Sequence, residues 1–198
     1  MGVSVEDIKK LKELTGIGLT DAKKALVEVE GDFDKALEAL RKKGLTKAEK
    51  KGNRETRAGI IESYVHSGRI GVVVEVNCET DFVARLPEFK EFAHQMAMQI
   101  AAMAPQYATM EDIPTDVMES KKKELLESDS LKQKPAEMAE KIVEGQLKKH
   151  FAEQVLSEQA FVLDDGKTVD ERIKEQIAQN GENIRISQFK RIELGVTE

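Results

Sequence analysis

A strand, a polar corner and the start of a helix follow one another in Ile70-Gly71-Val72-Val73-Val74-Glu75-Val76-Asn77-Cys78-Glu79-Thr80-Asp81-Phe82-Val83-Ala84-Arg85-Leu86-Pro87. Alternate valines of the first half share one face of the predicted strand, so we expect that face to be buried. Apolar residues recur at helical spacing from residue 86 to residue 104, which predicts a long amphipathic helix. The Asp81-Phe82 pair thus lies at a strand-to-helix corner, and loops held on both sides commonly carry function.

Two interpretations of this corner follow from its chemistry. In the first, Phe82 completes the local core and Asp81 begins a turn, which is the more common role of such residues. In the second, the aromatic ring and the acid are exposed and insert into another molecule. The residues of the corner leave both interpretations open.

A β-hairpin precedes the corner. Its predicted strands are residues 59–66 and 69–77, and Ser67-Gly68 forms the two-residue turn between them. His66 ends the first strand beside the turn. A lone histidine at such a position is usually a surface residue.

The first 45 residues predict a compact bundle of three amphipathic helices, because their apolar residues recur at i, i+3, i+4 and i+7. Ser4, Thr20 and Asp32 are the predicted N-caps. Gly31 is expected to end the second helix and Gly44 the third. The bundle has its own apolar stripes, so we expect it to be a separate domain, residues 1–45.

Residues 46–57 lack apolar periodicity and carry five positive and two negative charges. This pattern is typical of a solvated basic linker or a frayed helix. Contact with nucleic acid is a less favoured alternative, because the run is short beside a true basic patch.

The remaining segments are predicted to complete one domain, residues 58–198. Two helical segments within about 114–157, broken at Lys134-Pro135, predict a helical hairpin, and Thr168 with Glu171 is expected to cap a last helix that Gly181 ends. The fold class is therefore α+β: a three-helix bundle, then a small antiparallel sheet packed with helices and the helical hairpin. The last strands are a short one at 161–163, followed by a turn at 164–166, and a closing strand in which Ile184, Ile186, Ile192 and Leu194 alternate.

Composition argues for a protein that contacts other proteins. The chain has 198 residues and a net charge of −6. Residues 1–57 carry 14 basic and 11 acidic side chains, whereas residues 58–198 carry 17 and 26. Because phosphate neutralisation supplies most nucleic-acid affinity, the acidic larger part argues against direct nucleic-acid binding.

Several classes of function are not indicated. The single cysteine, Cys78, and three scattered histidines provide no metal-ligand spacing, and no nucleophile lies in a catalytic motif. Gly16 and Gly18 lack the context of a phosphate loop. No apolar run approaches the ~20 residues of a membrane span, and the N-terminus lacks signal-peptide features. We expect a cytoplasmic protein that is not an enzyme and has no metal, no cofactor and no membrane contact.

Five motifs, spread from the first helix to the last strand, carry a family resemblance. They are Thr80-Asp81-Phe82-Val83-Ala84-Arg85, Leu14-Thr15-Gly16-Ile17-Gly18-Leu19-Thr20-Asp21-Ala22-Lys23-Lys24-Ala25-Leu26, Ser63-Tyr64-Val65-His66-Ser67-Gly68-Arg69-Ile70-Gly71-Val72, Glu158-Gln159-Ala160-Phe161-Val162 and Asn183-Ile184-Arg185. With them the chain resembles bacterial elongation factor Ts, the guanine nucleotide exchange factor of elongation factor Tu. The resemblance implies a ubiquitin-associated-like fold for the bundle and binding to elongation factor Tu that is loaded with GDP.

The resemblance also implies roles for particular residues. The wedge that disturbs the partner's magnesium and phosphate site, and so promotes GDP release, would be Thr80, Asp81, Phe82 and Val83. Further partner contacts would be made by Lys9, Lys12, Leu19, Thr20 and His66. The familiar family pattern has two methionines where this chain has Leu19 and Thr20, and arginine at Lys12. The apolar contact is kept at Leu19 and weakened at Thr20.

The assembly of the chain is a further expectation. Longer members of the family contain two copies of the core subdomain, whereas this chain has one, and a sheet of about three strands leaves edges to cover. We therefore expect a homodimer in which a second chain supplies the second subdomain. The alternative function is a ubiquitin-associated-like interaction scaffold that binds ribosomes or helical ligands.

Overall fold

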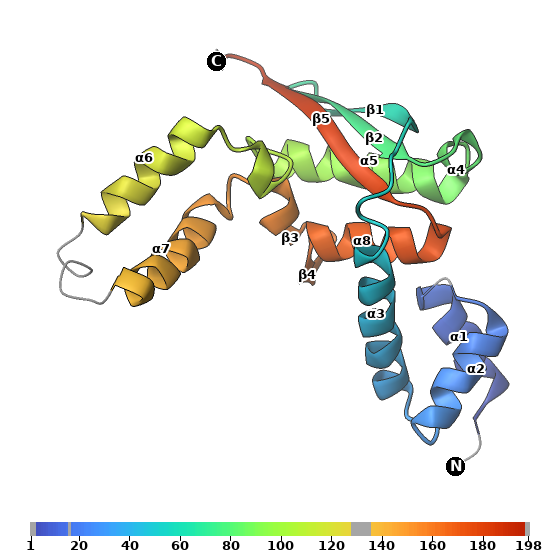
Figure 1. Cartoon of the computed structure of the whole chain (residues 1–198). Helices are drawn as coiled ribbons and strands as arrows, with labels where there is room; N and C mark the ends of the chain where they lie inside the picture. The colour runs from blue at the N-terminus through green and yellow to red at the C-terminus, as the bar shows by residue number, and fades with distance from the viewer. Residues whose placement is uncertain (1–2, 16, 128–135, 197–198) are drawn as a thin grey trace. The chain divides into compact units, whose positions relative to one another are not determined.

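The computed structural model describes residues 3–15, 17–127 and 136–196 (Figure 1). The chain divides into two compact units. The first unit combines the chain up to residue 62 with residues 74–95 and 171–187. The second combines residues 63–73 with 96–170 and the chain from residue 188. Helices and strands mix along the chain, which confirms the α+β class.

The first unit contains the predicted helical bundle: α1 (Val5–Thr15), α2 (Leu19–Glu28) and α3 (Phe33–Glu49). Asp32 caps α3 by accepting a hydrogen bond from the backbone N–H of Lys35. Thr20 is not the cap that the sequence predicted, because α2 begins two residues earlier, at Leu19, and Gly18 occupies the cap position. The apolar stripes meet in a small core of Leu11, Ala22, Ala25, Leu26 and Ala36.

Helix α3 continues to Glu49. The sequence predicted that it would end at Gly44, and that prediction is wrong. Gly44 has no positive φ, so its backbone is not that of a helix stop. A Cβ added at Gly44 would lie 3.3 Å from the Cβ of Ala178, so the glycine permits a close approach of two helices. Part of the segment predicted as a linker or frayed helix is therefore regular helix.

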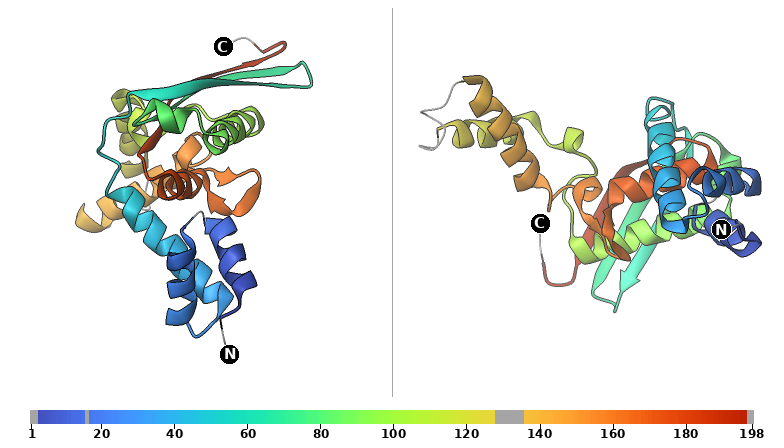
Figure 2. Two further views of the ribbon diagram at one scale, coloured as in Figure 1. Left: turned by 90° about the vertical axis from the view of Figure 1, so that its right-hand side faces the viewer. Right: turned by 90° about the horizontal axis from the view of Figure 1, so that it is seen from below.

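The three-stranded sheet has the order β1-β2-β5, with β1 at Ala58–His66, β2 at Ile70–Cys78 and β5 at Ile184–Glu193. Ser67 and Gly68 have φ of 50° and 67°, which confirms the two-residue turn of the hairpin (Figure 2, left). The backbone N–H of Leu194 donates to the carbonyl of Arg69, so β5 runs antiparallel to β2. The expected alternation of β2 holds, since its buried side chains are Val72, Val74, Val76 and Cys78.

Strand β5 departs from the expected pattern. Ile184 and Ile186 are buried, whereas Ile192 is 72% exposed and Leu194 is 64% exposed. The contact of Arg191 explains why the later apolar residues of β5 are exposed. Its Nε donates a hydrogen bond to the carbonyl of Ala101 at 3.2 Å. Arg191 thus points toward the helix that carries Ala101, and the next residue, Ile192, points to the opposite face of the strand.

Helices α4 (Asp81–Ala84) and α5 (Pro87–Met103) follow β2 in the chain, and α8 (Val169–Asn180) precedes β5. Gly181, with φ of 77°, ends α8 as predicted. The predicted apolar stripe of α5 is confirmed, because its buried side chains include Phe89, Phe92, Ala93, Met96, Ala97, Ile100 and Ala101.

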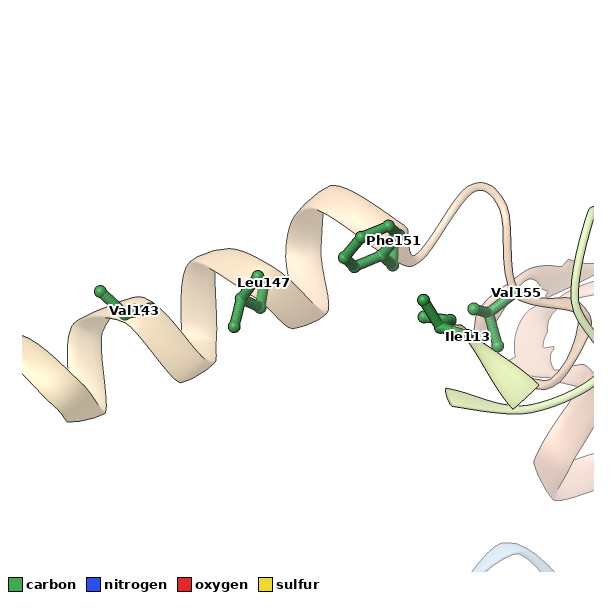
Figure 3. Packing of buried hydrophobic residues seen from close by; sticks show 5 residues of the cluster. All are labelled: Ile113, Val143, Leu147, Phe151 and Val155. Carbon is green, nitrogen blue, oxygen red and sulfur yellow. The ribbon is translucent and has the colours of Figure 1, made fainter. Parts of the chain in front are cut away.

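The second unit contains the helical hairpin, formed by α6 (Thr115–Leu126) and α7 (Ala136–Phe151). The predicted break at Lys134-Pro135 lies outside the described residues. Val143, Leu147 and Phe151 recur along α7, and Ile113 lies next to Val155 beyond its end (Figure 3). These five side chains form a small apolar core of the hairpin's own.

Two 3-10 turns, Met110–Asp112 and Leu156–Glu158, and a two-stranded sheet complete the second unit. Strand β3 (Ala160–Phe161) pairs antiparallel with β4 (Asp164–Thr168), and Phe161 faces Asp164 in the register. The turn therefore lies at residues 162–163, not at 164–166 as the sequence predicted. Among the described residues no helix is both long and apolar enough to cross a membrane.

Candidate functional site

The strand-to-helix corner folds as a capped helix of one turn. Thr80 has an extended backbone, and its Oγ1 accepts a hydrogen bond from the backbone N–H of Val83 over an N-to-O distance of 3.5 Å. Val83 and Ala84 turn inward and are buried. Phe82 turns outward and is 78% exposed, which excludes the interpretation that it completes the core. Thr80, Asp81, Phe82 and Val83 are thus together at one corner, and only the middle two side chains project into solvent.

Asp81 has a partner on the corner itself. Its Oδ2 lies 2.7 Å from Nη2 of Arg85, and both side chains are exposed. Such surface pairs contribute little to stability, typically ~0–1 kcal/mol. The Asp81 carboxylate can therefore leave Arg85 at little cost when another positive group approaches.

Cys78, the last residue of β2, lies beneath the corner. The thiol is buried and donates to the carbonyl of Thr80 over 3.1 Å. Burial, together with the nearby carboxylate of Glu182, raises the pKa of Cys78 to about 11. The thiol is consequently protonated at neutral pH.

Two residues from the loop between α8 and β5 hold the corner in place. Glu182 accepts from both the backbone N–H and the hydroxyl of Thr80, at 3.0 Å and 2.7 Å. The backbone N–H of Asn183 donates to Oε1 of Glu79 at 2.7 Å. Sequence reasoning missed Glu182 and Glu79, because the partners are about 100 residues apart and no local pattern links them.

The predicted contacts of the bundle are all on its surface. Lys9 and Lys12 lie on α1 and are exposed, and Leu19 and Thr20 begin α2. Leu19 is 51% exposed, so it offers apolar area to a partner. Thr20 also borders a shallow depression along α2, which is further lined by Lys23, Lys24, Val27 and Glu28. These residues belong to the same compact unit as the corner.

His66 belongs to the other compact unit. It is exposed at the end of β1, and its Nδ1 lies 2.9 Å from the hydroxyl oxygen of Tyr64. The two rings are tilted, with centroids 6.0 Å apart. When the Tyr64 hydroxyl donates to Nδ1, Nε2 carries the ring proton and can donate it to an acceptor.

The described part of the chain holds no group of three or more histidine, cysteine, aspartate or glutamate side chains placed to bind a metal ion. The features that do stand out are a rigid exposed aromatic corner and a surface of short bundle helices. Both are suited to contact with a macromolecule.

Comparison with known proteins identifies the family of this chain. The family model for elongation factor TS matches residues 6–196. Elongation factor Ts of Thermotoga neapolitana is 55% identical over 196 residues, which cover 98% of this chain and 98% of that protein. Elongation factor Ts of Syntrophomonas wolfei is 50% identical, with 98% and 91% covered, and the chloroplastic elongation factor Ts of Rhodomonas salina is 49% identical, with 98% and 89% covered. The chain therefore belongs to the elongation factor Ts family.

Proposed function

We propose that this chain is a translation elongation factor that binds elongation factor Tu loaded with GDP and promotes release of the GDP. The observation that carries the proposal is the exposed Phe82 ring on a capped, anchored corner, in a chain of the elongation factor Ts family. A ring that water surrounds in the free protein is available to a partner. Burying it there is worth ~1.5–3 kcal/mol.

The proposed mechanism is a competition between two ligands of the GTPase. A factor that binds the nucleotide-free partner more tightly than the loaded one lowers the affinity for nucleotide by the same ratio. Magnesium neutralises the phosphates of the bound nucleotide, so displacing the ion weakens the hold on GDP. Phe82 supplies the intruding volume, Asp81 a negative charge beside the ion, and Thr80 with Val83 the support behind them.

The bundle and the hairpin supply the remaining contacts in this proposal. Lys9 and Lys12 provide positive charge on α1, and Leu19 with Thr20 provides the contact at the start of α2. His66 donates from Nε2 to an acceptor near the partner's phosphate loop, while Tyr64 holds the other ring nitrogen.

We also propose that two chains associate. One face of the sheet in the second unit exposes Val65, Val73, Ile192 and Leu194, with exposed fractions of 67%, 49%, 72% and 64%. The opposite face of β2 is buried. Packing this exposed face against its copy in a second chain would cover the apolar side chains with isologous contacts.

The test is GDP release from elongation factor Tu loaded with a fluorescent GDP. Substoichiometric amounts of the chain are expected to accelerate release many times over, and added magnesium is expected to oppose the effect. The immobilised chain should retain nucleotide-free elongation factor Tu and lose it when GDP and magnesium are added together. Binding without acceleration would instead favour an interaction scaffold, and absence of binding would overturn the proposal.

A further inference from the structure

We infer that Glu182 is a positioning residue for the Asp81-Phe82 corner, an inference that rests on the proposed exchange function. Glu182 lies after the end of α8, 102 positions from Thr80. Its two carboxylate oxygens accept separate hydrogen bonds from Thr80, Oε2 from the backbone N–H at 3.0 Å and Oε1 from the hydroxyl at 2.7 Å. One side chain thus fixes both the backbone and the side chain of the N-cap residue of α4.

The consequence for α4 follows from the hydrogen-bonding capacity of a hydroxyl group. A threonine hydroxyl has one proton to donate and two lone pairs to accept with. Because Glu182 takes the proton, only lone pairs remain for the N–H of Val83, and Thr80 is held as an acceptor cap. Without Glu182 the proton can rotate toward other acceptors, and the cap loses its fixed orientation.

The corner needs such an anchor because α4 is too short to be stable by itself. It has four residues, and an isolated helical turn costs more conformational entropy than its hydrogen bonds return. The direction in which Phe82 projects therefore depends on what holds the ends of α4. Arg85 pairs with the exposed carboxylate of Asp81. Glu182 is partly buried and holds the N-terminal end of α4 through Thr80, beside the weaker contact of the Cys78 thiol with the Thr80 carbonyl.

Glu182 is itself carried by a fixed loop. The next residue, Asn183, is buried, and its amide nitrogen donates to the carbonyls of Arg54 at 2.8 Å and of Gly52 at 3.2 Å. The backbone N–H of Asn183 donates to Glu79, immediately before Thr80. Before Glu182, the carbonyl of Gly181 accepts from Nζ of Lys51. The loop is thus tied to the segment that leaves α3 on one side and to the corner on the other.

The experiment compares Glu182→Ala, Thr80→Val and the double variant with Glu111→Gln as a control, because Glu111 is an exposed carboxylate outside the proposed contacts. Phe82→Ala is the reference for the exchange function itself. For each variant we measure kcat and KM of GDP release from elongation factor Tu, and backbone amide hydrogen exchange across residues 79–86 of the free chain. Circular dichroism gives the folded fraction by which the rates are normalised.

A positioning role predicts a specific pattern. Glu182→Ala should lower kcat about tenfold, the size of effect expected from losing hydrogen bonds to a charged group, with KM changed less than about twofold. Amide exchange across residues 79–86 should rise. Thr80→Val should act through the same contact, so the double variant should lose no more than the worse single variant.

Other outcomes separate the failure of this inference from the failure of the proposed function. If Phe82→Ala reduces exchange while Glu182→Ala leaves kcat and amide protection as in Glu111→Gln, the corner functions without its anchor and the inference is overturned. Equal loss of kcat per folded molecule in the Glu111→Gln control also overturns it. If Phe82→Ala exchanges normally, the ring is not the exchange wedge, and the role of Glu182 in orienting it falls while the exchange function stands. If the unaltered chain does not accelerate GDP release, the proposed function itself falls.

Discussion

Two exposed apolar regions of this chain differ in how they are built. At the corner, a single ring, Phe82, projects from one helical turn whose N-cap residue, Thr80, is held by the polar side chain of Glu182. On the part of the sheet that lies in the second unit, Val65, Val73 and Ile192 spread apolar area over neighbouring strands. A clamped single ring is suited to one demanding contact. An open, flat face is suited to burying area against another flat face.

Among the variants that test this comparison, Phe82→Ala is expected to have the largest effect on nucleotide exchange. Exchange should fall roughly tenfold or more, because truncating a central aromatic anchor commonly costs ~2 kcal/mol or more of binding energy. The free energy of unfolding should change by less than ~0.5 kcal/mol, since the ring is exposed in the free chain. Urea unfolding and GDP release are measured side by side.

Leu163→Ala is the matched control for Phe82→Ala, because Leu163 is a large apolar side chain, 54% exposed, in the turn between β3 and β4. It should affect neither measurement. A loss of ~3–5 kcal/mol of stability in Phe82→Ala with normal exchange would assign the ring to the core instead.

The next effect concerns the open face. Ile192→Lys should convert the proposed dimer into a monomer, because it places a charge in the middle of an apolar contact that must lose its water. Light scattering at micromolar concentration measures the mass. Val162→Lys, at a half-exposed position in the β3-β4 turn, should leave the mass unchanged. A monomer mass for the unaltered chain at all concentrations would show that the open face has no second copy as its partner.

A smaller effect on exchange is expected from Asp81→Ala. The exposed pair of Asp81 with Arg85 adds little to stability, so folding should be nearly unchanged. Exchange should fall less than in Phe82→Ala, because the intruding volume remains and only the charge is lost. Asp81→Asn, which keeps the size and the polarity, separates the loss of charge from the loss of the side chain. A larger loss than that of Phe82→Ala would make the acid, not the ring, the principal group of the corner.

The smallest expected effect is on the pH dependence of stability, and it comes from the titration of the Cys78 thiol beneath the corner. Burial raises the pKa of Cys78 from 9.0 to about 11, so the folded chain binds this proton more tightly than the unfolded chain does. The corresponding stabilisation is complete below about pH 9 and is lost as the pH rises toward about 11. Urea unfolding at several pH values should show this decline. Cys78→Ala should flatten that part of the profile, and an identical profile in both chains would contradict the assignment to the thiol.

Several elements of the fold were predictable because their causes are local. The alternation of valines in β2, the turn at Ser67-Gly68 and the end of α8 at Gly181 each depend on residues within a few positions of one another. The same holds for the stripe of α5. The motif around Asp81-Phe82 was likewise visible in the sequence and indicated where to look for a site.

Other features could not be read from local pattern. Gly44 has the signal of a helix end, yet its role is to let Ala178 approach closely, which only the packing of α3 near α8 creates. Ile192 continues the apolar series of β5 in the sequence. The hydrogen bond of Arg191 to Ala101 directs Arg191 toward α5, so Ile192 is on the opposite face of the strand and is exposed.

The sequence by itself determined the class of the fold, the family and the position of the corner, because periodicity, turn residues and contiguous motifs are local properties of a chain. Only the tertiary structure decided that Phe82 is exposed and that Glu182 holds Thr80. Whether a side chain is buried depends on which distant segment covers it. A hydrogen bond across 102 positions exists only once the chain has folded and brought its two partners within 3 Å.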